Sequence, residues 1–305
     1  MRRVVQRILP DGTICFVQPF HVSMEGLEDC ILCRDDEDYD TMVKIICVAA
    51  RRKNVIVIIY AVVSNHCHIA ILASSQKEAD DYGNEVKRIY AMWFRKKYQI
   101  EGIMRDVDIK ALCLDNDWYV RNALAYIPRN ALDNGCNVNT YPWSGYSAMF
   151  SSNAQAYFNS RKVSDLTKRE RLKVMHTGDS LLNVSWRIDG HGYLIPRSIC
   201  DYKYLEQAFE NSQAYFLRTI GAVNSSELKN KLVDAPRRMQ SDGEFLKSIE
   251  EICQRWFQSP SLSLSLERKT RLIPYVNRTM KTSVAQLARV FGLPRQTISE
   301  ILNPK

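Results

Sequence analysis

The 305-residue sequence lacks a long hydrophobic run. Its longest uninterrupted apolar stretch, Val55 to Val63, is far shorter than the roughly 20 residues that a membrane-spanning helix needs. Near the amino end, Pro10, Asp11 and Gly12 interrupt the chain before an apolar secretion segment can develop. We therefore expect no membrane anchor, no membrane partner and a cytoplasmic location.

The sequence also lacks a disulfide framework and internal repeats. The nine cysteines are odd in number and irregularly spaced, which argues against a disulfide framework and favours reduced, mostly buried thiols. Cys30 and Cys33 form one CxxC pair, but no second pair follows at the spacing of a zinc site. With 46% hydrophobic and 25% charged residues, the composition excludes a disordered or fibrous chain, and the length predicts roughly two or three domains.

Basic charge is concentrated in the second half of the chain. Residues 1–150 contain 18 Lys and Arg against 19 Asp and Glu, whereas the remainder contains 24 against 15. From residue 260 onward, eight basic residues face only Glu267 and Glu300. Such a basic tail is typical of a protein that binds a polyanion, most often nucleic acid, although a solvated surface would have the same composition.

Strand and helix patterns alternate in the first 150 residues. Strand patterns occupy 13–23, 55–63 and 69–72, and helical spacing occupies 39–52 and 79–97. Asp117 is typical of the cap of a further helix. The continuous β-branched run at 55–63 indicates buried central strands. This order predicts an α+β domain in residues 1–150, with one antiparallel sheet backed by helices.

The rest of the chain divides at a Ser-rich joint at 259–266. Residues 151–258 are expected to be mostly helical and show no catalytic constellation. Residues 259–305 predict a helix-turn-helix, because Gly292 supplies a tight turn inside an apolar seam made of Leu287, Phe291, Leu293, Ile298 and Ile301. The exposed face of its second helix would carry residues suited to bases and phosphates: Arg295, Gln296, Thr297 and Ser299. A helical hairpin packed on the middle region is the alternative.

The sharpest local feature is the sequence Ser64-Asn-His-Cys-His68 inside the strand pattern. Side chains on a strand alternate between faces, so His66 and His68 point the same way and can hold one metal ion. Imidazole nitrogens suit zinc, manganese, iron or copper, and a mixed nitrogen and oxygen site can also take magnesium. Two polar residues on the open face of a sheet would show the same pattern.

Tyr126 and Asn130 form a second feature. Four residues apart on a helix, they share one face, where an asparagine oxygen can bind a metal and a tyrosine hydroxyl can attack an electrophile. A buried tyrosine packed against the sheet is the ordinary explanation for such a residue.

Together these segments resemble a known family, the single-tyrosine HUH transposases. Five strings carry the resemblance, in similar order and spacing: Phe20-His-Val-Ser23, Tyr60-Ala-Val-Val-Ser-Asn-His-Cys-His-Ile-Ala-Ile-Leu72, Tyr90-Ala-Met-Trp-Phe-Arg-Lys-Lys-Tyr98, Tyr126-Ile-Pro-Arg-Asn130 and Tyr141-Pro-Trp-Ser-Gly-Tyr146. They are most similar to the REP-associated tyrosine transposases, whose hallmark strings are Met-Pro-Asn-His-x-His, Tyr-Ile-x-x-Asn-Pro and Trp-Ser-Ser-Tyr. The resemblance covers roughly residues 13–150.

The resemblance implies a ferredoxin-like HUH catalytic domain in residues 1–150. His66, His68 and Asn130 would bind a divalent metal ion, Mg²⁺ or Mn²⁺, which would polarise the scissile phosphate. Tyr126 would be the nucleophile, leaving a 5′-phosphotyrosine bond and a free 3′-hydroxyl on single-stranded DNA. The implied protein is a DNA-cleaving and rejoining transposase that acts on a hairpin as a monomer or homodimer, in association with the nucleoid.

Five positions depart from the family strings. Val63-Ser64 replaces Met-Pro, and Ala131 replaces the proline after Asn130. Pro128 lies between Tyr126 and Asn130, where a helix interior would lose about 3 kcal/mol and could kink. Glu25 stands where the family places an arginine, which removes a positive charge near the expected DNA groove.

Three functions are consistent with these observations. The first is a metal-dependent single-stranded DNA endonuclease and strand transferase that uses Tyr126, with the C-terminal module holding it on duplex DNA near its element. The second is a domesticated, non-cleaving DNA-binding regulator of the same fold, which Pro128 and Glu25 would favour. The third is a replication or mobilisation nickase, distinguished by an origin rather than an element end as its target. No acidic residue stands out as a general base.

Overall fold

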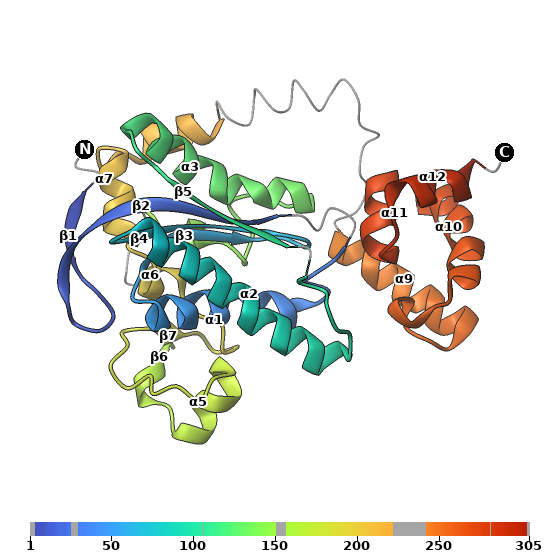
Figure 1. The fold of residues 1–305 in the computed structure, drawn as a ribbon, viewed down its shortest axis with the longest axis horizontal. Coiled ribbons are helices and arrows are strands. Elements are labelled where there is room, and N and C mark those ends of the chain that lie inside the picture. The colour runs from blue at the N-terminus through green and yellow to red at the C-terminus, as the bar shows by residue number, and fades with distance from the viewer. Residues whose placement is uncertain are drawn as a thin grey trace.

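The computed structural model describes residues 4–25, 30–105, 107–150, 157–221, 242–280 and 282–303. A five-stranded antiparallel sheet forms its centre (Figure 1). The strands are β1 (Val5–Ile8), β2 (Ile14–Glu25), β3 (Ile56–Val62), β4 (Cys67–Ala73) and β5 (Asp108–Cys113). They lie in the order β5-β2-β4-β3, and β1 pairs with the first residues of β2.

Two helices connect these strands, α1 (Asp36–Arg52) and α2 (Gln76–Tyr98). From β2 to β5 the elements follow the order β-α-β-β-α-β, which is the order of ferredoxin-like folds. Each helix begins at a side-chain cap, because Asp35 accepts a hydrogen bond from Asp38 N and Ser75 accepts one from Glu78 N. The predicted antiparallel sheet backed by helices is therefore confirmed.

The two faces of the sheet are covered by different helices, because residues alternate between faces along each strand. On one face, Phe20 and Ile69 pack into a core with α1 and α2. On the other face, Leu72 packs with α3 (Asp117–Arg129) and α7 (Tyr202–Ala208). Figure 1 shows α3 on the opposite side of the sheet from α1 and α2.

The hydrophobic run at 55–72 forms one central strand and one edge strand, where the sequence predicts two central strands. β4 lies between β2 and β3, whereas β3 is the last strand in the order. Loop backbone covers its outer edge, because Val62 N donates to Trp143 O (2.9 Å) and Asp201 N donates to Val57 O (2.7 Å). An apolar run indicates that both faces of a strand are buried, but it does not show whether a further strand pairs with that strand's outer edge.

The start of α3 also differs by one residue from the prediction. Asn116, and not Asp117, is the cap, and its side chain accepts a hydrogen bond from Tyr119 N (2.9 Å). Both residue types are good caps, and only the extended backbone at position 116 decides between them.

Residues 157–221 pack onto the sheet domain. Their elements are β6 (Arg161–Lys162), η3 (Val163–Asp165), α5 (Lys168–Met175), β7 (Arg187–Ile188), α6 (Pro196–Ile199), α7 and a helical stretch at 213–221, and η2 (Gly145–Ala148) precedes them. Leu181 and Leu194 join the core under α1, and Phe209 and Phe216 join the core under α3. This packing differs from the expected separate, mostly helical region at 151–258.

The C-terminal helices form a core of their own. They are α9 (Asp242–Phe257), η4 (Ser261–Ser263), α10 (Leu266–Met280), α11 (Val284–Phe291) and α12 (Arg295–Leu302). Of the predicted seam, Leu287, Phe291 and Ile298 are buried in this core, and Leu293 and Ile301 pack against it. Gly292 ends α11 in the left-handed region (φ +60°), as the predicted turn requires. Because α9 contributes to the same core, the described part of this unit includes residues 242–257, ahead of the expected joint at 259.

Within the described ranges, no helix is both long and apolar enough to cross a membrane. All nine cysteines lie among the described residues, and none forms a disulfide; five are buried and four half-buried.

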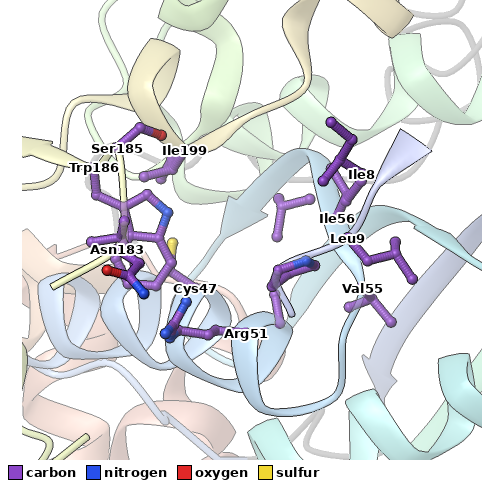
Figure 2. A pocket seen from close by; sticks show the side chains of 14 residues that line it. Ile8, Leu9, Cys47, Arg51, Val55, Ile56, Asn183, Ser185, Trp186 and Ile199 are labelled. Carbon is purple, nitrogen blue, oxygen red and sulfur yellow. The ribbon is translucent and has the colours of Figure 1, made fainter. Parts of the chain in front are cut away.

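A pocket of about 430 Å³ opens between the β1–β2 hairpin, the end of α1 and residues 183–186 (Figure 2). Its walls are mostly apolar, with Arg51 and Asn183 among the polar groups. The pocket lies at the start of β3, whereas the histidine pair follows the end of that strand. It is therefore separate from the candidate site.

Candidate functional site

The turn between β3 and β4 carries the histidine pair. Val63 N donates to His66 O (3.0 Å), which closes the turn directly before β4 begins. His68 is the second residue of β4 and is only 5% exposed, whereas His66 is half-buried at the mouth of the turn. Their ring centroids are 5.0 Å apart, with an interplanar angle of 78°. The structure therefore brings the two predicted histidines together.

Helix α3 places Tyr126 beside this pair. The Tyr126 ring meets the His68 ring edge to face, with centroids 5.2 Å apart. Tyr126 is half-exposed, so an incoming molecule can reach it, and the guanidinium carbon of Arg129 lies 5.1 Å from its ring centroid. A partly accessible hydroxyl-bearing side chain, a buried imidazole and a buried cation thus share one small region.

Asn130 ends α3 one turn after Tyr126. Its amide nitrogen donates to the carbonyl oxygens of Tyr126 and Ile127, both at 3.1 Å, so it caps the helix. Its amide oxygen Oδ1 is buried and has no hydrogen-bond partner among the described residues. Pro128 lies in the last turn of α3, which η1 (Asn130–Asn134) follows directly. The proline therefore does not prevent Asn130 from contacting the carbonyl oxygen of Tyr126.

A third histidine, His21 of β2, belongs to the same cluster. A hydrogen bond of 3.1 Å joins its Nε2 to Nδ1 of His68, and its ring lies 6.3 Å from that of Tyr126. The register explains the contact: Ser23 pairs directly with His68, which puts His21 on the diagonal of the same face. The polar alternation of His21 and Ser23 between buried apolar residues was the available sequence signal.

The electrostatics of the cluster keep His68 neutral. Burial is the main cause that holds the pKa of His68 well below its ordinary value of 6.5, and Coulomb repulsion between its protonated form and His66, His21 and Arg129 lowers the pKa further. A neutral imidazole can act as a metal ligand. Because Nδ1 of His68 is joined to His21, its Nε2 is the nitrogen left for a ligand.

The residues present fit a divalent metal ion with nitrogen and oxygen ligands. Two adjacent imidazoles and the buried, unpartnered oxygen of Asn130 supply such donors. No group of three His, Cys, Asp or Glu side chains in the described part of the chain is arranged to hold a metal ion. A metal here would therefore need the Asn130 oxygen, or oxygens from a bound phosphate, in addition to histidine.

The second predicted site lies on α12. Arg295 and Gln296 are exposed and Thr297 and Ser299 are half-exposed, while Ile298 faces the core. These side chains therefore form the outer face of the second helix, as an element that enters a DNA groove requires.

The basic charge around α12 is smaller than the sequence count indicates. Arg268, Arg271 and Arg278 of α10 and Arg295 are exposed. Arg289, in contrast, is buried and ion-paired with Asp242, so it does not contribute to a DNA-binding surface.

Comparison with known proteins identifies this C-terminal segment. Residues 260–305 match the CENP-B N-terminal DNA-binding domain. No curated protein and no solved structure matches the chain. Helices α10 to α12 are thus similar to a DNA-binding domain of the helix-turn-helix type, and the resemblance of residues 13–150 to HUH transposases stays a prediction.

Proposed function

We propose that this protein is a metal-dependent endonuclease and strand transferase for single-stranded DNA, with Tyr126 as its nucleophile. One observation carries the proposal: the ring of Tyr126 lies 5.2 Å from that of His68, which in turn adjoins His66. These residues come from two separate segments of the chain, α3 and the turn that leads into β4, and they are the tyrosine and the histidine pair to which the HUH resemblance assigns the catalytic roles.

The side chains have distinct roles in this proposal. His66, His68 and Asn130 would hold Mg²⁺ or Mn²⁺, which would supply charge stabilisation at the scissile phosphate. The Tyr126 hydroxyl oxygen forms a bond to phosphorus, and the bond from phosphorus to the 3′ oxygen breaks. The phenol proton leaves to solvent, the departing 3′ oxygen takes up a proton, and the product is a 5′-phosphotyrosine with a free 3′-hydroxyl. The cation of Arg129 near the ring favours the phenolate that develops on the way.

The C-terminal domain supplies the contact with duplex DNA. The match of residues 260–305 to a DNA-binding domain supports DNA as a partner, and α12 presents the residues that would contact it. Tethering a nuclease next to its target raises the effective concentration of the cleavable strand. This organisation suits an enzyme that works at the ends of its own element.

A non-cleaving DNA-binding regulator is the second candidate. The amide of Asn130 caps α3, which is a structural role that needs no metal ion. The matched DNA-binding domain would suffice for such a regulator.

Formation of a covalent adduct separates the two. The full chain is incubated with labelled single-stranded hairpins from the DNA flanking its own gene, with Mn²⁺ or Mg²⁺, and then denatured. We expect a denaturation-resistant adduct that Tyr126→Phe and His66→Ala abolish. Tyr119→Phe, an exposed tyrosine on the same helix, is the matched control and should retain the adduct. Tight binding without an adduct in the unaltered protein would favour the regulator.

A further inference from the structure

A buried carboxylate joins the C-terminal helices to the turn that carries the histidine pair. Asp242 begins α9, and its side chain is 2% exposed. Its Oδ2 accepts hydrogen bonds from Ser64 Oγ (2.7 Å) and Arg289 Nε (2.7 Å). Its Oδ1 accepts from Arg289 Nη2 (2.9 Å) and Gln286 Nε2 (3.1 Å). Arg289 and Gln286 both lie on α11, the first helix of the helix-turn-helix. Ser64 lies two residues before His66.

Ser64 is held firmly on its own side of the interface. Its backbone oxygen accepts hydrogen bonds from Leu32 N (2.7 Å) and Cys33 N (2.9 Å), and its side chain is buried. The turn closes around it through the bond from Val63 N to His66 O. Because the backbone around Ser64 is tied together by these bonds, a shift of Asp242 that keeps its hydrogen bond to Ser64 acts on the whole turn.

A second contact runs beside this one. Arg34 Nη2 donates to Ser261 Oγ (3.1 Å) and to Glu250 Oε1 (3.4 Å), and Ile31 is buried in the core of the C-terminal helices. The segment 30–34 therefore docks on α9 and η4 through Arg34 and Ile31, while its Leu32 and Cys33 amides contact Ser64 O. Loss of the Arg34–Ser261 bond leaves the Ser64–Asp242 bond in place, so the Arg34–Ser261 bond is a reference for the effect of the interface alone.

We propose that Ser64 and Asp242 are positioning residues for His66 and His68, and that duplex DNA bound by α12 changes the histidine turn through α11 and Asp242. The paired bonds between Arg289 and the carboxylate fix the angle of α11, and α12 packs on α11 through their shared core. A fully satisfied buried network tolerates few other geometries, so a shift of α11 reaches Ser64. The inference needs DNA binding by the C-terminal domain and does not need cleavage.

Nuclear magnetic resonance of the histidine rings tests the proposal. The full chain, labelled with ¹³C at histidine Cε1, is titrated at low salt with a short random-sequence duplex, because phosphate contacts then dominate binding. We expect the His66 and His68 signals to shift and the signal of the exposed His191 to stay. In Ser64→Ala the duplex should bind equally well, but the His66 and His68 response should be lost.

Ser261→Ala is the matched control, since it removes a hydrogen bond from the same interface but not from the turn, and it should keep the response. Gln286→Met, which breaks the network from α11, is a second variant should Ser64→Ala not fold, and the same loss is expected. Absence of duplex binding, unmoved His66 and His68 signals at saturation, or an undiminished response in both variants would overturn the proposal. Mn²⁺ added to the free protein tests the metal site separately, because failure to broaden these signals refutes metal binding and leaves the coupling result intact.

Discussion

Replacing Asp242 by alanine removes the acceptor of four hydrogen bonds and the counter-charge of Arg289. The donors left behind are all buried: the Arg289 side chain is 7% exposed, and Gln286 and Ser64 are 1% exposed. Water cannot replace the carboxylate without opening the interface between the sheet domain and the C-terminal helices. The substitution therefore leaves an uncompensated charge in a dry environment.

The expected cost follows from that environment. Removing one partner of a buried ion pair typically destabilises a protein by about 3–5 kcal/mol, because the remaining charge stays desolvated. Gln286 and Ser64 each lose a buried hydrogen bond to Asp242 as well, which acts in the same direction by about 1 kcal/mol each. We expect the loss to be concentrated in α9–α12, since Arg289 and Gln286 are buried residues of α11.

Hydrogen exchange of the backbone amides of α11 measures this loss locally. A loss of about 3 kcal/mol in the opening free energy accelerates exchange by about 150-fold. Glu267→Gln is the control, because it breaks an exposed pair with Arg271 (side chains 77% and 74% exposed) that is worth about 0.3–0.5 kcal/mol, roughly a twofold effect. Exchange in Asp242→Ala no faster than in this control would refute the reasoning.

Three further predictions concern the sites. Because the pKa of His68 is held well below 6.5, the unfolded chain binds a proton that the folded chain excludes, and stability should fall as pH drops below 6.5 by up to about 1.4 kcal/mol per pH unit. Urea unfolding in the presence of a chelator should give a free energy of unfolding that depends less on pH for His68→Gln than for the unaltered protein. An unchanged pH dependence would contradict the burial argument. His21→Leu should weaken Mn²⁺ binding, measured by calorimetry, by about 10–100-fold, because His68 loses its ring partner; equal affinity would show that His21 does not orient it. Arg295→Ala should lower duplex affinity and reduce the salt slope by about 1, and an unaltered slope would mean that α12 does not contact phosphate.

The sheet and its helices could be predicted because their side chains follow regular periods. The runs at 55–63 and 69–72 alternate with helical patterns, and the structure places strands and helices accordingly. The position of β3 at the edge could not be predicted, since its burial comes from helices and from loop backbone at Trp143 and Asp201. Those contacts join residues about 80 or more apart in sequence, and no local pattern encodes them.

The candidate site was predictable only where its residues lie close together in sequence. His66 and His68 are two residues apart around the start of β4, and Tyr126 and Asn130 are one helical turn apart, so short-range geometry suffices for each pair. His21 required the register between β2 and β4, which depends on the whole sheet. The contact between Tyr126 and the histidine pair was expected from the family resemblance. The spacing of these residues in the sequence does not predict it.

The count of basic residues overestimated the surface charge because it included Arg289. A count of basic residues treats every arginine as surface charge, whereas Arg289 lies opposite Asp242, 47 residues earlier in the chain. Both residues are buried, and their charges cancel within the core. The DNA-binding surface therefore depends on the exposed arginines of α10 and α12.

The two halves of the Asn130 side chain bear differently on the choice between nuclease and regulator. The amide nitrogen makes two hydrogen bonds as a helix cap, which either function would retain. The amide oxygen is buried without a partner, and an unsatisfied buried acceptor costs about 1–3 kcal/mol. A cap alone gives no reason to bear that cost at a position one turn from Tyr126. A divalent ion held by His66 and His68 would satisfy the oxygen if it also bound Asn130, so this atom favours the proposed nuclease. Added Mn²⁺ should then raise the melting temperature of the unaltered protein more than that of Asn130→Ser.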